Sequence, residues 1–277
     1  MPCQARGNFS SVVPTCVLLL MSAAPSAIYA QSETTKSPEK ANFTTIEFPS
    51  ADGLVITADL YRSADDKNIP MIVLCHQAGW SRGEYRETAP KLVAMGFNCL
   101  AIDQRSGDKT EGVPNETAKR AATDGKPTGF VDAEQDMIAA ITYARENYAE
   151  GKLVLWGSSY SAALAMRIAG ENPDKVDAVL AFAPGEYFGR FGKPKDWIAT
   201  SAAKITAPAF ITSAKNEAGS WAAIYDAIPG TDKTSFLPDT RGNHGSRDLW
   251  KRFDDNKAYW SAVTPFLKKL QPEPAGN

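Results

Sequence analysis

The sequence predicts one α/β domain built on a mostly parallel sheet of about eight strands, with helices on both faces. Three observations support this fold class. Apolar runs of strand length alternate with segments of helical periodicity along most of the chain. A turn that contains Asp-Gly separates the first two runs, as in an antiparallel hairpin. The later runs are apolar throughout, as expected for parallel strands that are buried on both faces.

Between the later predicted strands lie segments with helical or loop patterns, which would carry the chain back to the start of the next parallel strand. The run at 70–76 is continuously apolar, and the segment after it has helical spacing and ends at Gly96. A long polar loop is expected at 104–129, before an amphipathic helix at 132–149 and a helix at 161–172. The predicted strands are 44–49, 54–62, 70–76, 97–103, 152–156, 176–184, 207–213 and 233–239.

The first 30 residues have the pattern of a secretory signal peptide. Arg6 precedes the apolar run CVLLLMSAA, and the small-residue tail SAIYA ends at Ala30. We expect cleavage after Ala30 and export to the periplasm or the medium. The alternative is an N-terminal anchor, although this run is short for a bilayer. Residues 31–43 are expected to form a flexible leader, and residues 44–277 the folded domain, with no integral membrane segment in the mature chain.

The bulk composition excludes several classes of function. The 277 residues are 43% hydrophobic and 22% charged, with a formal net charge of −2, so nucleic-acid partners are not expected. The chain has two histidines and no cysteine pair with metal-ligand spacing, so neither a metal nor a cofactor is predicted. Cys75 and Cys99 lie inside apolar runs, which favours buried small hydrophobes over a disulfide.

The segment GSSYS at 157–161 follows a predicted strand and opens a predicted helix. A nucleophile on such a sharp turn needs small residues two before and two after it, because strand and helix crowd there. Ser159 meets this condition, with Gly157 and Ser161 as its neighbours, whereas Ser158 does not. Ser161 stands where the G-x-S-x-G pattern has its last glycine, and a helix N-cap is the alternative interpretation of this serine cluster.

A serine nucleophile needs a base, and histidine is the usual one. His244 follows the last predicted strand in the sequence RGNHGSRDLW, after Ser159 in the chain. In a mostly parallel sheet, this loop and the turn at Ser159 meet at the same edge, where the strands end. The order agrees with Ser, acid, His along the chain.

From about residue 44 onward the chain resembles the α/β-hydrolases, near the dienelactone-hydrolase and serine-esterase branch. The matching motifs are VLCHQAGW, AIDQRSGD, LWGSSYSA, APAFITSAKNE and GNHG. The resemblance implies an α/β-hydrolase fold, and the short segment between 184 and 207 implies that no large cap domain is present. Dienelactone hydrolases have a cysteine nucleophile, so their exact activity is not implied.

The resemblance also implies the remaining site residues. The usual position of the acid falls on Asn216, and the adjacent Glu217 is the predicted acid, with Glu186 as the alternative. Backbone N–H groups of Tyr160 and of Gln77 or Ala78 are expected to form the oxyanion hole.

The predicted function is a serine hydrolase that cleaves small or medium carboxylic esters through an acyl-enzyme, with a small-molecule ester as its partner. Amide, peptide or thioester hydrolysis and a non-catalytic binding protein of the same fold are the alternatives.

Overall fold

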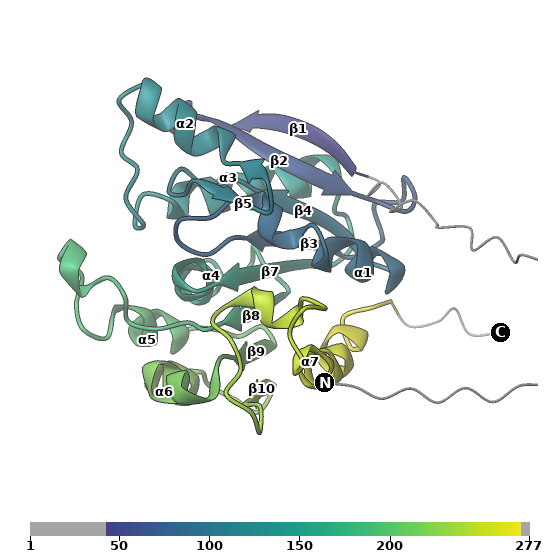
Figure 1. Cartoon of the computed structure of the whole chain (residues 1–277), viewed down its shortest axis with the longest axis vertical. Coiled ribbons are helices and arrows are strands. Elements are labelled where there is room, and N and C mark those ends of the chain that lie inside the picture. The colour runs from purple at the N-terminus through teal and green to yellow at the C-terminus, as the bar shows by residue number, and fades with distance from the viewer. Residues whose placement is uncertain (1–42, 273–277) are drawn as a thin grey trace, which may run out of the picture. The chain divides into compact units, whose positions relative to one another are not determined.

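The computed structural model describes residues 43–272, which form an eight-stranded sheet with helices packed on both faces (Figure 1). The sheet order is β1-β2-β4-β3-β7-β8-β9-β10. The strands of this sheet are β1 (Phe43–Pro49), β2 (Val55–Tyr61), β3 (Met71–Cys75), β4 (Asn98–Ile102), β7 (Leu153–Ser158), β8 (Ala178–Phe182), β9 (Ala209–Thr212) and β10 (Lys233–Phe236). The helices are α1 (Thr88–Ala94), α2 (Glu116–Thr123), α3 (Glu134–Asn147), α4 (Tyr160–Glu171), α5 (Trp197–Ala202), α6 (Ala218–Ala227) and α7 (Asn256–Lys268).

The sheet is mixed, as the sequence predicts. β1 pairs with β2 and β2 with β4 in antiparallel fashion, and every other neighbouring pair is parallel. The hairpin turns at Gly53, whose φ of 81° is readily available only to glycine. The predicted leader ends one residue too late, because Phe43 already pairs with Tyr61 in the first hairpin. The predicted signal peptide lies outside the described residues.

Two apolar cores lie on opposite faces of the sheet. Helices α1 and α7 cover one face, and α3, α4, α5 and α6 cover the other (Figure 1). Cys75 and Cys99 lie on neighbouring strands, but their side chains belong to different cores. Both are buried free thiols. This arrangement leaves the carboxyl ends of β3, β7, β8 and β9 at one edge, where the candidate site lies.

The loop predicted at 104–129 is more structured than expected. It contains the short hairpin β5 (Lys109–Thr110) and β6 (Val113–Pro114), followed by α2. The Asn115 side chain caps α2 by accepting the Ala118 N–H at 2.8 Å. Thr117 is buried, and its hydroxyl accepts the Thr57 N–H at 2.9 Å. Polar residues predict a loop here, whereas the structure has a helix with a local cap and a buried contact to β2.

The segment between β8 and β9 is short. Within the described residues it holds one 3₁₀ turn (Gly189–Phe191) and the six-residue helix α5, so the domain carries no large cap there. No helix within residues 43–272 is both long enough and apolar enough to cross a membrane.

Candidate active site

A sharp turn between β7 and α4 carries Ser159. Its φ of 59° and ψ of −119° cost a non-glycine residue on the order of 1–3 kcal/mol, and such strain recurs where a turn presents a nucleophile. The Ser159 N–H donates to the Phe182 carbonyl at 2.7 Å, which ties the turn to the end of β8. A Cβ atom on Gly157 would lie 2.3 Å from the Ser161 carbonyl oxygen, so only glycine fits there. The small residues that the sequence offers are therefore a requirement of this turn.

Ser161 stands where the usual pattern has glycine, and its hydroxyl is integrated into the turn. It accepts the Ser158 N–H at 2.9 Å and donates to the Cys75 carbonyl at 2.8 Å. The departure from G-x-S-x-G therefore preserves the turn and adds side-chain hydrogen bonds to it.

The structure brings together Ser159, His244 and Glu217, the serine, base and acid predicted from the sequence. The Ser159 hydroxyl donates to Nε2 of His244 at 2.7 Å. Nδ1–H of His244 donates to Oε1 of Glu217 at 2.7 Å. Glu217 ends a 3₁₀ turn (Lys215–Glu217) directly after β9, and His244 lies on the loop that follows β10. Such an arrangement can take the proton of the serine hydroxyl and stabilise the imidazolium that results.

The alternative acid, Glu186, has a different role. Its carboxylate accepts the N–H groups of Ile198 at 3.0 Å and Ala199 at 2.8 Å, at the start of α5. A carboxylate at this position satisfies N–H groups that have no partner within the helix. Glu186 is therefore a helix-capping residue, and the contact with His244 is made by Glu217.

Two of the three predicted oxyanion donors remain free. Within residues 43–272, no hydrogen-bond partner occupies the N–H of Tyr160 or that of Ala78. The Gln77 N–H donates to Oε2 of Glu84 at 2.8 Å, so the expectation that Gln77 supplies a donor is wrong in this structure. The buried carboxylate competes for that N–H and holds it away from a ligand.

His76, the second histidine, orients the loop after β3. Its side chain is fully buried, and burial lowers its pKa to about 4, so the imidazole is neutral. Nδ1–H donates to the Gln77 carbonyl at 2.8 Å, and Nε2 accepts the Gln104 N–H at 3.1 Å. Both ring nitrogens are therefore engaged within the protein.

Comparison with known families agrees with this geometry. Residues 66–210 match the model of the family described as serine aminopeptidase, S33, which is just over half of the chain. The chain belongs to this family. The match includes Ser159 and ends before Glu217 and His244. This S33 chain is thus an α/β hydrolase, and the resemblance stated from its motifs is confirmed at that level.

Two curated relatives match about half of the S33 chain. A quorum-quenching protein, AidA, from Acinetobacter baumannii is 32% identical over 143 residues, which are 50% of this chain and 43% of the relative. A thiohydrolase, apmlB, from Arthrinium phaeospermum is 31% identical over 152 residues, which are 54% of this chain and 45% of the relative. The aligned regions thus span less than half the length of either relative.

Solved structures share the fold of this S33 chain. An esterase from Pyrococcus furiosus superposes with a TM-score of 0.63 at 18% identity, over 83% of this chain and 93% of the esterase. A dienelactone hydrolase from Anabaena variabilis gives a TM-score of 0.63 at 15% identity, over 83% of this chain and 99% of the hydrolase. At these identities the likeness establishes the fold alone.

Sequence reasoning missed Glu84, which lies behind the nucleophile turn. Its side chain is fully buried, and burial raises its pKa to about 7. Oε1 accepts the Ser158 hydroxyl at 2.7 Å. In the sequence, the segment around Glu84 is typical of an exposed helix start, and no local pattern marks this carboxyl as buried.

A cavity of about 430 Å³ lies between the loop before α3 and the 3₁₀ turn before α5. It is lined by Thr128, Gly129, Phe130, Arg190 and Phe191. The Phe130 ring stacks on Tyr160, the residue after the nucleophile, with ring centroids 4.7 Å apart. The Arg190 guanidinium lies 5.5 Å from the centre of the Phe130 ring. Phe130 thus links this cavity to the residue that follows Ser159, although Ser159 is not itself among the lining residues.

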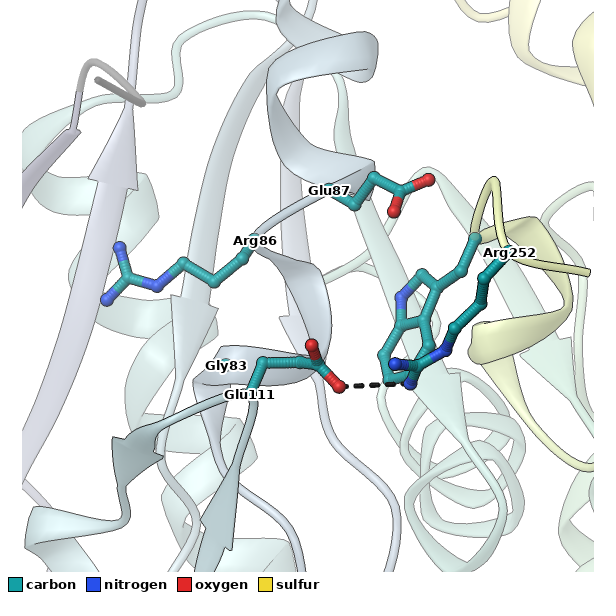
Figure 2. Close-up of a pocket in the computed structure, with 6 residues that line it drawn as sticks. Gly83, Arg86, Glu87, Glu111 and Arg252 are labelled. Atoms are coloured by element: carbon teal, nitrogen blue, oxygen red, sulfur yellow. Dashed lines mark hydrogen bonds and ion pairs between the residues drawn. The ribbon is translucent and has the colours of Figure 1, made fainter. Parts of the chain in front are cut away.

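A second cavity, of about 390 Å³, contains none of the predicted site residues; it is lined by Gly83, Arg86, Glu87, Glu111, Trp250 and Arg252. Figure 2 shows the Glu111 carboxylate reaching the Arg252 guanidinium, 2.9 Å away, while the Arg86 side chain points in the other direction. Arg86 pairs with the buried Asp59 at 2.8 Å. Three of the four charged side chains of this cavity, Arg86, Glu111 and Arg252, are thus paired within the protein. No group of His, Cys, Asp or Glu side chains that could hold a metal ion occurs within residues 43–272.

Proposed function

We propose that the protein is a serine carboxylesterase that cleaves small or medium carboxylic esters through an acyl-enzyme on Ser159. One observation carries this proposal. Oγ of Ser159 and Oε1 of Glu217 each lie 2.7 Å from a different nitrogen of His244. A serine on a strained turn, with an imidazole and a carboxylate in line, is the arrangement that nucleophilic acyl transfer needs.

In the proposed mechanism, His244 takes the proton of the Ser159 hydroxyl as Oγ attacks the ester carbonyl. The negative charge on the carbonyl oxygen is stabilised by the N–H groups of Tyr160 and Ala78, an effect worth about 10²–10³ in rate per donor. His244 then protonates the leaving alcohol. Water, deprotonated by His244, attacks the acyl-enzyme. As the bond to Oγ breaks, His244 returns the proton to Ser159 and the acid is released.

The cavity beside Phe130 supports the proposed substrate size. About 430 Å³ lies within the range of small-molecule pockets and suits a short acyl or alcohol group. Phe130 and Phe191 offer apolar surface to that group. The Arg190 guanidinium lies over the rings of Phe130 and Phe191, 5.5 and 4.9 Å from their centres, and offers a positive charge to a polar substituent.

Thioester hydrolysis is the second candidate, because one relative at 31% identity is described as a thiohydrolase. Oxygen esters and thioesters need the same nucleophile, base and oxyanion donors. The family description also makes aminoacyl amides worth testing. A serine-directed probe distinguishes the hydrolases from a non-catalytic binding protein, because only an activated serine reacts with it.

The experiment is fluorophosphonate labelling of the purified protein, beside Ser159→Ala and His244→Ala. We expect the wild type to be labelled and both variants to lose labelling. A panel of short-chain aryl esters, matched thioesters and aminoacyl anilides then ranks the substrate classes by kcat/KM. An unlabelled wild type would reject the esterase proposal and favour a binding protein.

We also propose export with removal of residues 1–30. The basis is the composition of that segment alone. N-terminal sequencing of the protein recovered outside the cytoplasm should begin at Gln31. A chain recovered with an intact N-terminus would reject this proposal.

A further inference from the structure

The Glu84 carboxylate binds two of the loops that form the candidate site. Oε2 accepts the N–H of Gln77, which precedes the proposed oxyanion donor Ala78. Oε1 accepts the hydroxyl of Ser158, the residue before the nucleophile, at 2.7 Å. Both contacts are fully buried, so no water competes for them.

A third loop joins this network through Ser158. The Ser158 hydroxyl accepts the Ser246 N–H at 2.9 Å, two residues after His244. Gly245 packs directly against it, since a Cβ there would lie 2.5 Å from Oγ of Ser158. One carboxylate thus connects the segments that supply the oxyanion donor, the nucleophile and the base.

We infer that Glu84 is a positioning residue that holds the Gln77 loop, the Ser159 turn and the His244 loop in their reactive arrangement. This inference rests on the proposed function and goes beyond it, because Glu84 touches neither the reacting hydroxyl nor the substrate. Reacting groups misplaced by about 1 Å lose on the order of 100-fold in rate, so the network affects turnover more than substrate binding.

The hydrogen-bonding pattern favours the ionised form of Glu84. The backbone N–H and the side-chain amide of Gln77 donate to the Glu84 carboxylate at 2.8 and 3.5 Å, and the Ser158 hydroxyl donates to it at 2.7 Å. His244 also faces Glu84 and favours its charge. Burial opposes that charge and raises the pKa of Glu84 to about 7. The Glu84 charge in turn helps to raise the pKa of the neighbouring Tyr85, Cys75 and Tyr160, which stay neutral. The protein therefore holds the carboxylate at alkaline pH and loses it on acidification.

The test compares Glu84→Gln, Glu84→Ala and Ser158→Ala with wild type, using one aryl ester from pH 5.5 to 8.5. An amide can keep both contacts, because its oxygen accepts from Gln77 and its N–H₂ donates to Ser158. We expect Glu84→Ala to lower kcat about 100-fold with little change in KM. Glu84→Gln should recover most of that loss. The ratio of wild-type to Glu84→Gln activity should fall toward one as the pH drops below 7, because protonated Glu84 also lacks the charge.

Glu87→Gln is the matched control, because it changes an exposed carboxyl of the same segment and should leave kcat unchanged. Thermal melts identify any variant that fails to fold. Ser158→Ala removes the hydrogen bond between Ser158 and Ser246 with little change in side-chain volume. A folded Glu84→Ala within twofold of wild type would overturn the inference, as would a folded Glu84→Gln that recovers none of the activity lost in Glu84→Ala. A wild type without fluorophosphonate labelling would instead overturn the proposed function, and this inference with it.

Discussion

The hydroxyl of Ser161 donates to the Cys75 carbonyl at 2.8 Å, although 86 residues separate the two in the chain. This contact joins the first turn of α4 to the end of β3, next to the loop that contains Ala78. The same hydroxyl accepts the Ser158 N–H. A serine in place of the usual glycine thus connects two elements of the site.

Replacing Ser161 with alanine should destabilise the protein. The change leaves the buried Ser158 N–H without its acceptor, which costs about 1–3 kcal/mol, whereas the Cys75 carbonyl keeps the Tyr85 hydroxyl as a donor. Urea unfolding of Ser161→Ala beside wild type measures the difference. An unchanged free energy of unfolding would show that these contacts contribute no net stability.

The two glutamates proposed as acids should respond differently to removal of their charge. Glu217→Gln takes the carboxylate from His244 and should lower kcat by about 10²–10⁴, because the imidazolium loses its partner. Glu186→Gln should leave kcat within a few-fold and lower stability by about 1 kcal/mol, because it weakens the cap of α5. Paired kinetics and thermal melts on the two variants check this. A large loss of kcat in Glu186→Gln alone would reverse the assignment.

Gly245 should tolerate no side chain. Its φ of 80° strains any other residue, and a Cβ there would lie 2.5 Å from Oγ of Ser158. Gly245→Ala should therefore displace the His244 loop and lower both stability and kcat, each by more than the matched change at Gly230. That glycine has a φ of 76° with no atom within 4 Å of an added Cβ, so Gly230→Ala adds only the strain of about 1 kcal/mol. Equal effects on kcat in the two variants would contradict this prediction.

Asp248 should make stability depend on pH. Burial raises its pKa to about 8, and repulsion from Asp255 and Glu217 contributes to the increase. The hydrogen bond from the Asn243 N–H lowers the pKa and offsets part of it. The folded protein therefore binds a proton that the unfolded chain has released, and wild-type stability falls as the pH rises from about 4 to about 8. Asp248→Asn should gain on the order of 2–4 kcal/mol relative to wild type across that range.

Urea unfolding of wild type and Asp248→Asn at pH 5 and pH 8 measures this gain. The exposed Asp232→Asn is the control, and its effect on stability should be the same at both values of pH. A difference between wild type and Asp248→Asn that does not change with pH would show that Asp248 is ionised throughout.

Patterns that repeat along the chain predicted most of the fold. Alternating apolar strands and amphipathic helices gave the sheet and its two helix layers, because strand and helix periodicities follow from local backbone geometry. The choice of Ser159 among three serines also followed from a local steric condition, the small residues on either side. The prediction of a loop at 104–129 was incomplete, because Thr117 and Asn115 in this segment contact Thr57 and Trp80, which are distant in the chain.

The sequence by itself determined the fold class, the nucleophile turn and the position of His244 after the last strand, since each is written in neighbouring residues. It left the acid open between Glu217 and Glu186 and the oxyanion donor between Gln77 and Ala78. Only the tertiary structure distinguishes these candidates by their contacts: Glu186 caps α5, Glu217 contacts His244, and the Gln77 N–H donates to Glu84. The physical reason is that a carboxylate or an N–H group binds whichever partner the fold brings within 3 Å, and segments far apart in the chain supply that partner.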